Sequence, residues 1–339
     1  AARHFAQELR SEGFEVIYLK AETTLSGIAE IRKSKKITNV IAAEPHSFRL
    51  LADLEKEIEL IPSDFFLTAK SDFLSWAASQ KSLLMENFYR AQRKRLSILM
   101  DGDKPVGGAW NYDKENRLSP PKQYVYPEYL QHQRDQIDQE VLQELKDSNL
   151  SLWGAEPDST WATTRKGALK QLDNFLENHF ENFGPYEDAM VKENWAFHHS
   201  LLSPYLNIGL IHASEVIGAV RKRFQKGDIP LESCEGFVRQ VIGWREYVNG
   251  IYWQYGYEYR ESNHFKHTGE LPPLFDNPEI TEINCVKSVV ADVQKRSWVH
   301  HIPRLMILSN FAQLTNTKPQ ALLAWMRRVF IDATDWVMS

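Results

Sequence analysis

The sequence predicts an α/β domain over residues 1–100, a linker over residues 101–159 and an all-helical domain over residues 160–339. Three observations carry this prediction. Short apolar segments alternate with helical patterns in the first part of the chain, glycine and proline gather in the middle, and strand patterns are nearly absent after Thr160. Alternating strands and helices are typical of a parallel sheet covered by helices, whereas a series of amphipathic helices is typical of an all-α domain.

The first domain alternates helix and strand patterns. We expect helices at Ala2–Arg10, Ser26–Lys35 and Phe48–Lys56, and strands at Phe14–Leu19, Asn39–Ala43 and Ile58–Ile61. The segment Asn39–Ala43 is continuously apolar, as expected of a buried parallel strand, and the order predicts a Rossmann-like sheet. An α/β domain of this kind normally begins with a strand, but this chain begins inside a helix. We therefore expect the domain to be truncated ahead of Ala1.

A long amphipathic segment, Ser71–Met100, precedes the linker, and Asp101–Pro127 carries turn-forming glycines and prolines. In the second domain apolar residues recur at spacings of three and four, which predicts helices. We expect them at Lys166–Phe180, Ile211–Phe224, Val238–Tyr252, Val286–Gln294 and Arg304–Leu314.

The composition is that of an ordinary globular protein. Of the 339 residues, 43% are hydrophobic and 25% are charged, which argues against disorder and against a coiled-coil rod. No apolar run approaches the ~20 residues needed to cross a bilayer, and no signal-peptide pattern opens the chain. Two cysteines cannot form a disulfide framework, so we expect a reducing, cytoplasmic compartment. The net charge of −5 excludes nucleic-acid binding through bulk charge and leaves open a local basic patch.

The aromatic content is high, with 10 Trp, 13 Tyr and 17 Phe. Eight of the tryptophans lie from position 153 onward, and most of them are expected to fill a large helical core. Composition alone leaves open whether some of these rings line a cavity for a planar cofactor or form a relay of redox-active side chains.

Two segments combine groups that could bind phosphates. In His198–Gly209, Ser200 and Ser203 precede a helix start, where hydroxyls and exposed N–H groups suit a pyrophosphate. By spacing alone an ordinary capped helix explains this segment better. The second segment, Gly236–Tyr247, places cationic, amide and aromatic groups on one helix: Arg239, Gln240, Trp244 and Arg245. Such a set can hold phosphates or stack on a base, and a purely structural charged helix is an equal alternative.

A histidine doublet stands in the apolar segment Trp298–Met306. Burying His300 and His301 is costly unless the rings are hydrogen-bonded or used. Two adjacent histidines without nearby carboxylates make a poor metal site, since zinc ligands on a helix prefer a four-residue spacing. General acid catalysis is the better functional interpretation, with two core histidines as the ordinary alternative. Asp332 follows an apolar stretch and would need a cation if buried, for which Arg304 is the candidate.

These segments, in this order and behind an α/β domain, resemble the photolyase/cryptochrome family. Leu201–Val216 and Gly243–Trp253 are similar to the flavin-domain signatures of that family. Gly107–Arg117, Phe183–Met190 and Asn284–Met306 are similar to its iron–sulfur bacterial branch, which includes the prokaryotic (6-4) photolyases. The resemblance runs through essentially the whole chain, and several long motifs in order are far more specific than any one of them.

The resemblance implies a light-dependent DNA-repair enzyme, a (6-4) photolyase that reverts pyrimidine–pyrimidone photoproducts by electron transfer from excited reduced FAD. It implies that FAD is held in the helical domain by Ser200, Ser203, Arg245, Arg304 and Asp332. His301 is then the favoured proton donor, with His300 beside it, and Trp325 carries electrons. Cys285 matches the first of four cysteines that ligate a 4Fe-4S cluster.

Damaged duplex DNA is the implied partner of a protein that we expect to be monomeric. Basic residues at the pocket rim would hold DNA phosphates, with Arg239, Arg221 and Arg223 as candidates. In this branch the N-terminal domain also holds a lumazine-type antenna beside its first strand. We expect that strand and the other three cluster cysteines to lie outside this chain, so that antenna and cluster belong to a longer protein.

Three positions depart from the family pattern. Met326 stands where the electron relay has a tyrosine, Asn277 where it has a further tryptophan, and Met338 where other photolyases place an asparagine beside the flavin. These departures keep open a cryptochrome-type blue-light photoreceptor without repair activity. A third interpretation, which ignores the resemblance, is a nucleotide-binding helical protein without photochemistry.

Overall fold

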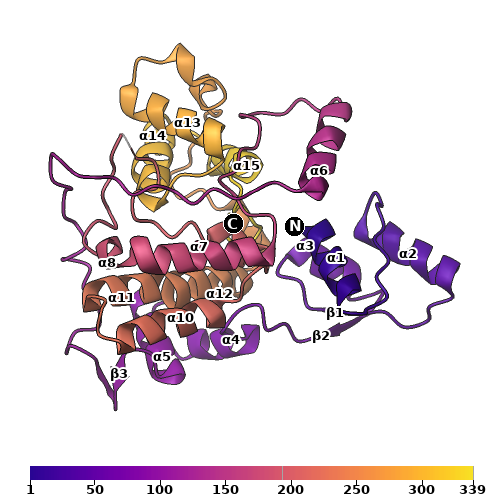
Figure 1. The fold of residues 1–339 in the computed structure, drawn as a ribbon, viewed down its shortest axis with the longest axis horizontal. Coiled ribbons are helices and arrows are strands. Elements are labelled where there is room, and N and C mark those ends of the chain that lie inside the picture. The colour runs from indigo at the N-terminus through magenta and orange to yellow at the C-terminus, as the bar shows by residue number, and fades with distance from the viewer. Residues whose placement is uncertain (193, 339) are drawn as a thin grey trace.

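The computed structural model describes residues 1–192 and 194–338, and its N-terminal part is a small α/β unit (Figure 1). The helices of this unit are α1 (Ala2–Ser11), α2 (Thr24–Lys35) and α3 (Phe48–Leu54), and its strands are β1 (Ile41–Ala43) and β2 (Glu59–Ile61). The strands pair in parallel, with Ile41 opposite Glu59 and Ala43 opposite Ile61. Local chemistry explains where α2 begins, because the Thr23 hydroxyl accepts a hydrogen bond from the Ser26 N–H. The predicted parallel sheet is confirmed as a two-stranded one within the described residues.

The predicted strand at Phe14–Leu19 is wrong. These residues form no strand, and the Arg10 guanidinium donates to the carbonyl of Val16, with its terminal nitrogen 3.0 Å away. A strand needs a neighbour that exchanges backbone hydrogen bonds with it, and the described sheet pairs only β1 with β2. Phe14–Leu19 has the apolar residues typical of a strand, but no neighbouring strand among the described residues pairs with it.

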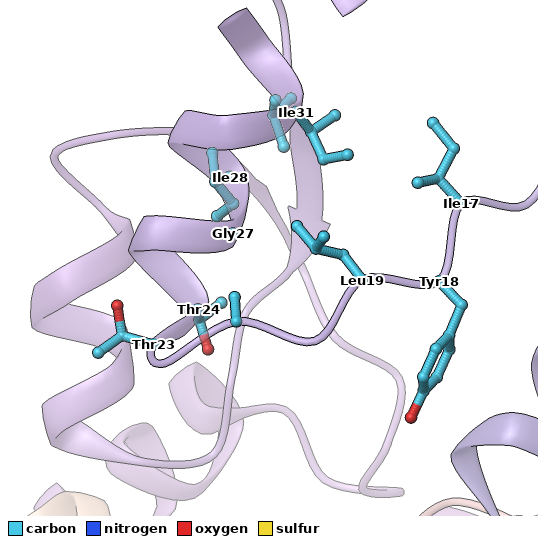
Figure 2. A pocket seen from close by; sticks show the side chains of 10 residues that line it. Ile17, Tyr18, Leu19, Thr23, Thr24, Gly27, Ile28 and Ile31 are labelled. Carbon is cyan, nitrogen blue, oxygen red and sulfur yellow. The ribbon is translucent and has the colours of Figure 1, made fainter. Parts of the chain in front are cut away.

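The largest cavity described in the N-terminal unit, of about 500 Å³, lies beside this segment. Its lining is mostly apolar and contains no charged side chain, and Figure 2 shows Leu19 pointing toward α2 while the Tyr18 ring turns away. Both strands end at exposed apolar side chains, since Ile41 is 53% exposed and Ile61 is 46% exposed. The N-terminal unit therefore keeps much of its apolar surface in contact with solvent.

The rest of the chain is mostly helical, as predicted. Its α-helices are α4 (Lys70–Ala78), α5 (Met85–Leu96), α6 (Gln136–Asp147), α7 (Arg165–Asn178), α8 (Phe180–Phe183), α9 (Ser203–Asn207), α10 (Ala213–Gln225), α11 (Leu231–Val238), α12 (Glu246–Tyr255), α13 (Asn284–Arg296), α14 (Asn310–Leu314) and α15 (Pro319–Val329). A short antiparallel pair, β3 (Met100–Asp101) and β4 (Lys104–Pro105), turns at Gly102. None of the described helices has the length and apolar character needed to cross a membrane.

The amphipathic segment Ser71–Met100 forms two helices, α4 and α5, rather than one. Both contact α12, and α5 also lies along the π-helical segment η1 (Arg239–Arg245). The approach of α4 to α12 is close: a Cβ at Gly250 would overlap the Phe73 ring. These two helices thus pack on the helical part of the molecule, as Figure 1 also shows.

Two predicted helices each contain a π-helical stretch. Val238–Tyr252 is divided into η1 and α12, and Arg304–Leu314 into η5 (Pro303–Ser309) and α14. A π-helix bonds each N–H one residue further back than an α-helix does, and such segments often occur at functional sites. Arg245 ends η1 and Arg304 lies near the start of η5, so both arginines predicted to bind the cofactor stand on widened turns.

Two hydrophobic clusters form the core of the helical part. The larger is built on α7 to α11 and η1 and includes Phe175, Phe180 and Phe237. The second is built on α13, η5 and α15 and includes Leu308 and Trp325. In Figure 1 the helices of the second cluster stand together above those of the first.

Candidate functional site

A polar cavity of about 250 Å³ lies where the two hydrophobic clusters meet. Phe183 and Phe237 of the first cluster and Val299 of the second form part of its wall. Its polar lining consists of Glu187, His199, Ser200, Ser203, Gln240, His300, His301, Arg304 and Asp332. The fold therefore brings together six of the residues assigned above to cofactor binding or catalysis: Ser200, Ser203, His300, His301, Arg304 and Asp332.

Three histidine rings gather on this lining. His199 and His300 stack with ring centroids 4.3 Å apart, and the His301 ring lies 5.7 Å from His199 and 5.6 Å from His300. Burial lowers the pKa of His199 and of His300 well below the ordinary value, and the neighbouring histidines lower it further. Both rings are therefore neutral near neutral pH, while the His301 side chain is 41% exposed.

Two consecutive carboxylates lie beside the histidines. The Nε2 atom of His301 is 3.2 Å from Oδ1 of Asp188. Glu187 is buried, and its two carboxylate oxygens accept from the amides of Gln240 and Asn116 at 2.7 and 2.8 Å. Burial raises the pKa of Glu187 to about 7, and the His301 charge opposes that rise. A carboxyl group with such a pKa can hold or release a proton near neutral pH.

An ion pair closes the other end of the cavity. Two guanidinium nitrogens of Arg304 donate to the two carboxylate oxygens of Asp332, at 3.0 and 2.9 Å. The Ser203 hydroxyl donates to the same carboxylate at 2.6 Å and accepts from the Trp298 indole at 3.2 Å. The Arg304 Nε donates to the carbonyl of Val299 at 2.7 Å. The pairing of Arg304 with Asp332 that was predicted from charge alone is confirmed, and it is tied to the serine turn.

The serine turn has an unusual backbone. Leu201, which is buried, has a φ of +57°, in the left-handed region that L-residues with large side chains seldom adopt. Within this turn the Ser200 carbonyl accepts a hydrogen bond from the Gln171 side-chain amide at 3.0 Å. Helix α9 begins directly after the turn, at Ser203. This conformation places the Ser200 and Ser203 side chains on the same cavity.

Arg245 lies away from this cavity. Its guanidinium is buried against Glu246, 3.0 Å away, and lies over the Phe66 ring at 4.1 Å from the centroid. Burial lowers the pKa of Arg245 and raises that of Glu246. The structure thus separates Arg245 from the other four residues predicted to hold the cofactor.

The three arginines predicted to hold DNA differ in accessibility. Arg239 is buried and pairs with Asp113 at 3.0 Å, with Glu235 at 3.8 Å. Arg223 is partly exposed and pairs with Asp228 at 3.2 Å. Arg221, on α10, is exposed. None of the three belongs to the cavity lining described above.

Trp325 lies in the second hydrophobic cluster at 2% exposure, with its indole nitrogen donating to the carbonyl of Phe275 at 3.1 Å. Its ring meets Phe330 edge-on at 6.0 Å, and Phe330 in turn lies under the Arg304 guanidinium, 4.1 Å away. Packing links Trp325 to the ion pair through one aromatic ring. Cys285 is exposed near the start of α13, and Cys234, the second cysteine, is buried in the other cluster.

His199, Glu187 and Asp188 were not predicted as site residues, but the fold brings all three to the predicted catalytic histidines. A signal was present, since a second histidine doublet stands at His198 and His199, and the two carboxylates are consecutive. The two doublets lie roughly a hundred residues apart in the sequence, and sequence periodicity predicts only which residues of one local segment share a face. Their contact could therefore not be predicted. Only the fold places the three rings together.

A curated (6-4) photolyase from Agrobacterium fabrum is 35% identical to this chain over 350 residues, a match that covers 99% of the chain and 69% of the relative. The chain belongs to the photolyase-related family. The family described as deoxyribodipyrimidine photo-lyase-related protein matches residues 1–161. An uncharacterised protein of Acanthamoeba polyphaga mimivirus is 29% identical over 133 residues, covering 36% of the chain and 68% of that relative.

The photolyase-like fold is supported by a solved structure as well. A bacterial class III photolyase from Agrobacterium tumefaciens superimposes with a TM-score of 0.63 over 93% of this chain, at 17% identity. The chain spans 63% of the length of that solved photolyase. The resemblance seen in the sequence motifs is thereby confirmed at the level of the photolyase-related family.

Membership of the photolyase-related family implies FAD as the cofactor. The polar cavity offers groups that fit part of such a molecule: the Ser200 and Ser203 hydroxyls, the Arg304 guanidinium, and buried ring nitrogens of His199 and His300 that have no hydrogen-bond partner among the described residues. Its volume of about 250 Å³ is just below the ~300–1,000 Å³ usual for pockets that enclose a whole ligand. The described cavity therefore fits one end of a dinucleotide rather than its full length.

Proposed function

We propose that this protein is a light-dependent DNA-repair flavoprotein of the (6-4) photolyase type. The observation that carries the proposal is the shared cavity, which is lined both by the predicted catalytic residues His300 and His301 and by the predicted cofactor pair Arg304 and Asp332. The identity of 35% to a (6-4) photolyase supports the same reaction class. Because the lesion must leave the base stack to reach a buried site, we propose that the damaged pyrimidine pair is flipped out of the duplex into this cavity.

Ser200, Ser203, Arg304 and Asp332 are the residues that we propose hold FAD in the cavity. Asp332 neutralises Arg304 and accepts from Ser203, so the guanidinium keeps a fixed orientation. When bound and excited by blue light, the reduced flavin supplies the electron for the lesion. Phe183, Phe237 and Val299 form apolar walls that exclude water from the same space. Arg245, which lies outside the cavity, would contact a part of the cofactor that extends beyond it.

His301 is the proposed proton donor to the lesion. It is the most exposed of the three histidines, and the Asp188 carboxylate, 3.2 Å from its Nε2, fixes the orientation of the ring. Glu187, whose pKa is about 7, lies on the same cavity and can return a proton to the site. His300 is buried and stacked on His199, so we assign it to holding His301 and the lesion in place.

Replacing His301 tests this assignment. His301→Ala should leave flavin binding intact and lower the rate of (6-4) repair by about 10²–10⁴-fold, the usual contribution of a positioned proton donor. Repair is measured on an illuminated (6-4)-containing oligonucleotide, and flavin binding by its visible absorbance. His264→Ala, at an exposed position, is the control and should repair at the wild-type rate. A His301→Ala protein that repairs as fast as wild type would contradict the proton-donor role.

Trp325 is the proposed entry of electrons toward the cofactor. Its full burial and its contact with Phe330 under Arg304 support this role. Trp325→Phe keeps the ring packing and removes the readily oxidised indole, so light-driven reduction of the flavin by an added thiol should slow by at least ~10-fold (about 1.4 kcal/mol in barrier). Unchanged photoreduction would remove Trp325 from the path.

The remaining cofactors are proposals for the longer protein. Cys285 could supply one thiolate to a 4Fe-4S cluster, which needs three further cysteines. Iron and acid-labile sulfide should then be stoichiometric with the full-length protein and be lost in Cys285→Ser. A lumazine-type antenna would appear as a second fluorescent chromophore released by denaturation. Absence of both would remove the assignment to the iron–sulfur branch and leave the flavoprotein proposal intact.

A blue-light photoreceptor without repair activity is the alternative. The departures at Asn277 and Met326 favour it, because a changed electron relay suits signalling as well as repair. Illuminating the purified protein with a (6-4)-containing oligonucleotide separates the two functions, since a photoreceptor returns the lesion unchanged. A protein that binds no flavin would instead favour the nucleotide-binding interpretation.

A further inference from the structure

The three histidines of the cavity come close enough to share a ligand. One ring nitrogen from each of His199, His300 and His301 lies within 4.8 Å of the other two. The rings come from two separate segments, the loop before α9 and the turn before η5, so the grouping is a product of the fold. The sequence argued against a metal site because two adjacent histidines alone make a poor one. The fold adds His199 as a third ligand from another segment.

Hydrogen bonds orient two of the rings. Nε2 of His301 faces Asp188, which leaves Nδ1 for another partner. The backbone of Glu187 hydrogen-bonds to the His199 ring, and the other nitrogen of that ring, Nε2, has no partner in the part of the chain that the structure describes. Histidines that bind metal in proteins typically use one nitrogen for the ion and give the other to a carboxylate or a backbone carbonyl. His199 and His301 both follow this pattern.

Two buried nitrogens in the cluster are unsatisfied. His199 Nε2 and His300 Nδ1 are both buried without a hydrogen-bond partner in the described residues. Burying such a polar atom unpaired costs on the order of 1–3 kcal/mol. A metal ion can accept the lone pairs of both nitrogens at once and so remove both of these energetic costs. A single added hydrogen-bond donor would satisfy only one of the two nitrogens.

We infer that His199, His300 and His301 form a binding site for a divalent transition metal of the Zn²⁺ or Co²⁺ class. Neutral imidazole is a preferred ligand of these ions, and three protein ligands leave a fourth position open toward the cavity. Magnesium and calcium fit poorly, since they prefer oxygen ligands. Ring nitrogens about 2.1 Å from a common tetrahedral ion stand about 3.4 Å apart, and each lone pair lies in the plane of its ring. Binding would therefore draw the nitrogens together and turn the His199 and His300 rings out of their present stack, in which the two planes differ by 23°.

Metal binding at this site does not depend on the proposed repair reaction. It would, however, occupy a ring nitrogen of the proposed proton donor His301 and of the neighbouring His300, so Zn²⁺ should inhibit any reaction that uses His301 as proton donor. Affinity is measured without light or DNA, so a failure of the metal site and a failure of the repair proposal give different results.

The test is a metal titration of chelator-treated protein above neutral pH. Wild type should bind one equivalent of Zn²⁺ by calorimetry, and Co²⁺ should give visible ligand-field bands beyond the flavin absorbance, as expected for four-coordinate nitrogen sites. His199→Gln should weaken Zn²⁺ binding by more than the ~10–100-fold expected when only an outer hydrogen-bond partner is lost. Asp188→Asn, which removes that outer partner of His301, should weaken it by about 10–100-fold.

His179→Gln is the matched control, because His179 is also buried but lies outside the cluster. It should bind Zn²⁺ like wild type. If His199→Gln fails to fold, judged by circular dichroism, the Asp188→Asn result decides. The proposal is overturned if wild type binds no stoichiometric Zn²⁺, if Asp188→Asn binds as tightly as wild type, or if His179→Gln loses affinity as strongly as the cluster variants.

Discussion

The N-terminal α/β unit and the helical part of the molecule bury their apolar side chains very differently. Ahead of residue 62 the only buried apolar residues described are Ala6 and Leu54, whereas the helical part holds two large clusters centred on residues such as Phe175 and Trp325. The two cavities differ in the same sense, since the lining of the N-terminal one contains no charged side chain, whereas the one in the helical part is lined by Glu187, Arg304 and Asp332. Most of the packing that stabilises the fold and the residues of the proposed site therefore lie in the same, helical part of the molecule.

The largest expected effect is a loss of packing in the helical core. Phe175 is fully buried against Phe180 and Phe237, so Phe175→Ala should lower the free energy of unfolding by about 3–5 kcal/mol. The matched change Phe14→Ala, at a side chain that is 60% exposed, should stay within about 0.5 kcal/mol. Chemical denaturation measures both. If both variants lost the same free energy of unfolding, the proposed difference in packing between the two regions would be wrong.

The next effect is acid sensitivity of the helical part. Burial lowers the pKa of His179 from 6.5 to about 4, so the folded state favours the neutral ring. The resulting stability is fully present above pH 6.5 and is lost as the pH falls toward 4, by about 3 kcal/mol at most. His179→Gln should flatten this slope. Urea denaturation at a series of pH values checks it, and parallel profiles for wild type and variant would contradict it.

The smallest effect concerns where DNA is held. Arg221, exposed on α10, is the most accessible of the three predicted DNA-binding arginines. Arg221→Ala should reduce the slope of log K against log salt by about 0.9, the value for one lost phosphate contact. Arg32→Ala, on α2 of the N-terminal unit, should leave the slope unchanged. Equal changes in both variants would mean that the N-terminal unit shares the DNA interface.

Most helices and the pairing of Arg304 with Asp332 could be predicted from the sequence, whereas the strand pairing and the histidine cluster could not. The difference has a physical reason. Periodicity is local, so α7, α10 and α13 were found within a few residues of their bounds. The partnership of Arg304 with Asp332 could be argued because a buried carboxylate needs a cation. Strand pairing and the meeting of His199 with His301 depend on distant segments, and no local pattern encodes them.

The π-helical segments η1 and η5 have a consequence for how this helical part tolerates insertion and deletion. Each α-helical residue turns the chain by about 100°, so adding or removing one residue rotates every side chain beyond it by that amount. A π-helical stretch has wider turns and carries one extra residue in about the same total rotation, so removing one residue from η1 and closing it to an ordinary α-helix would leave the face of α12 that receives α4 in place. The widened turns can therefore absorb a change of one residue in chain length, and a homologue lacking one residue there would present the same side chains of the following helix to the same neighbours.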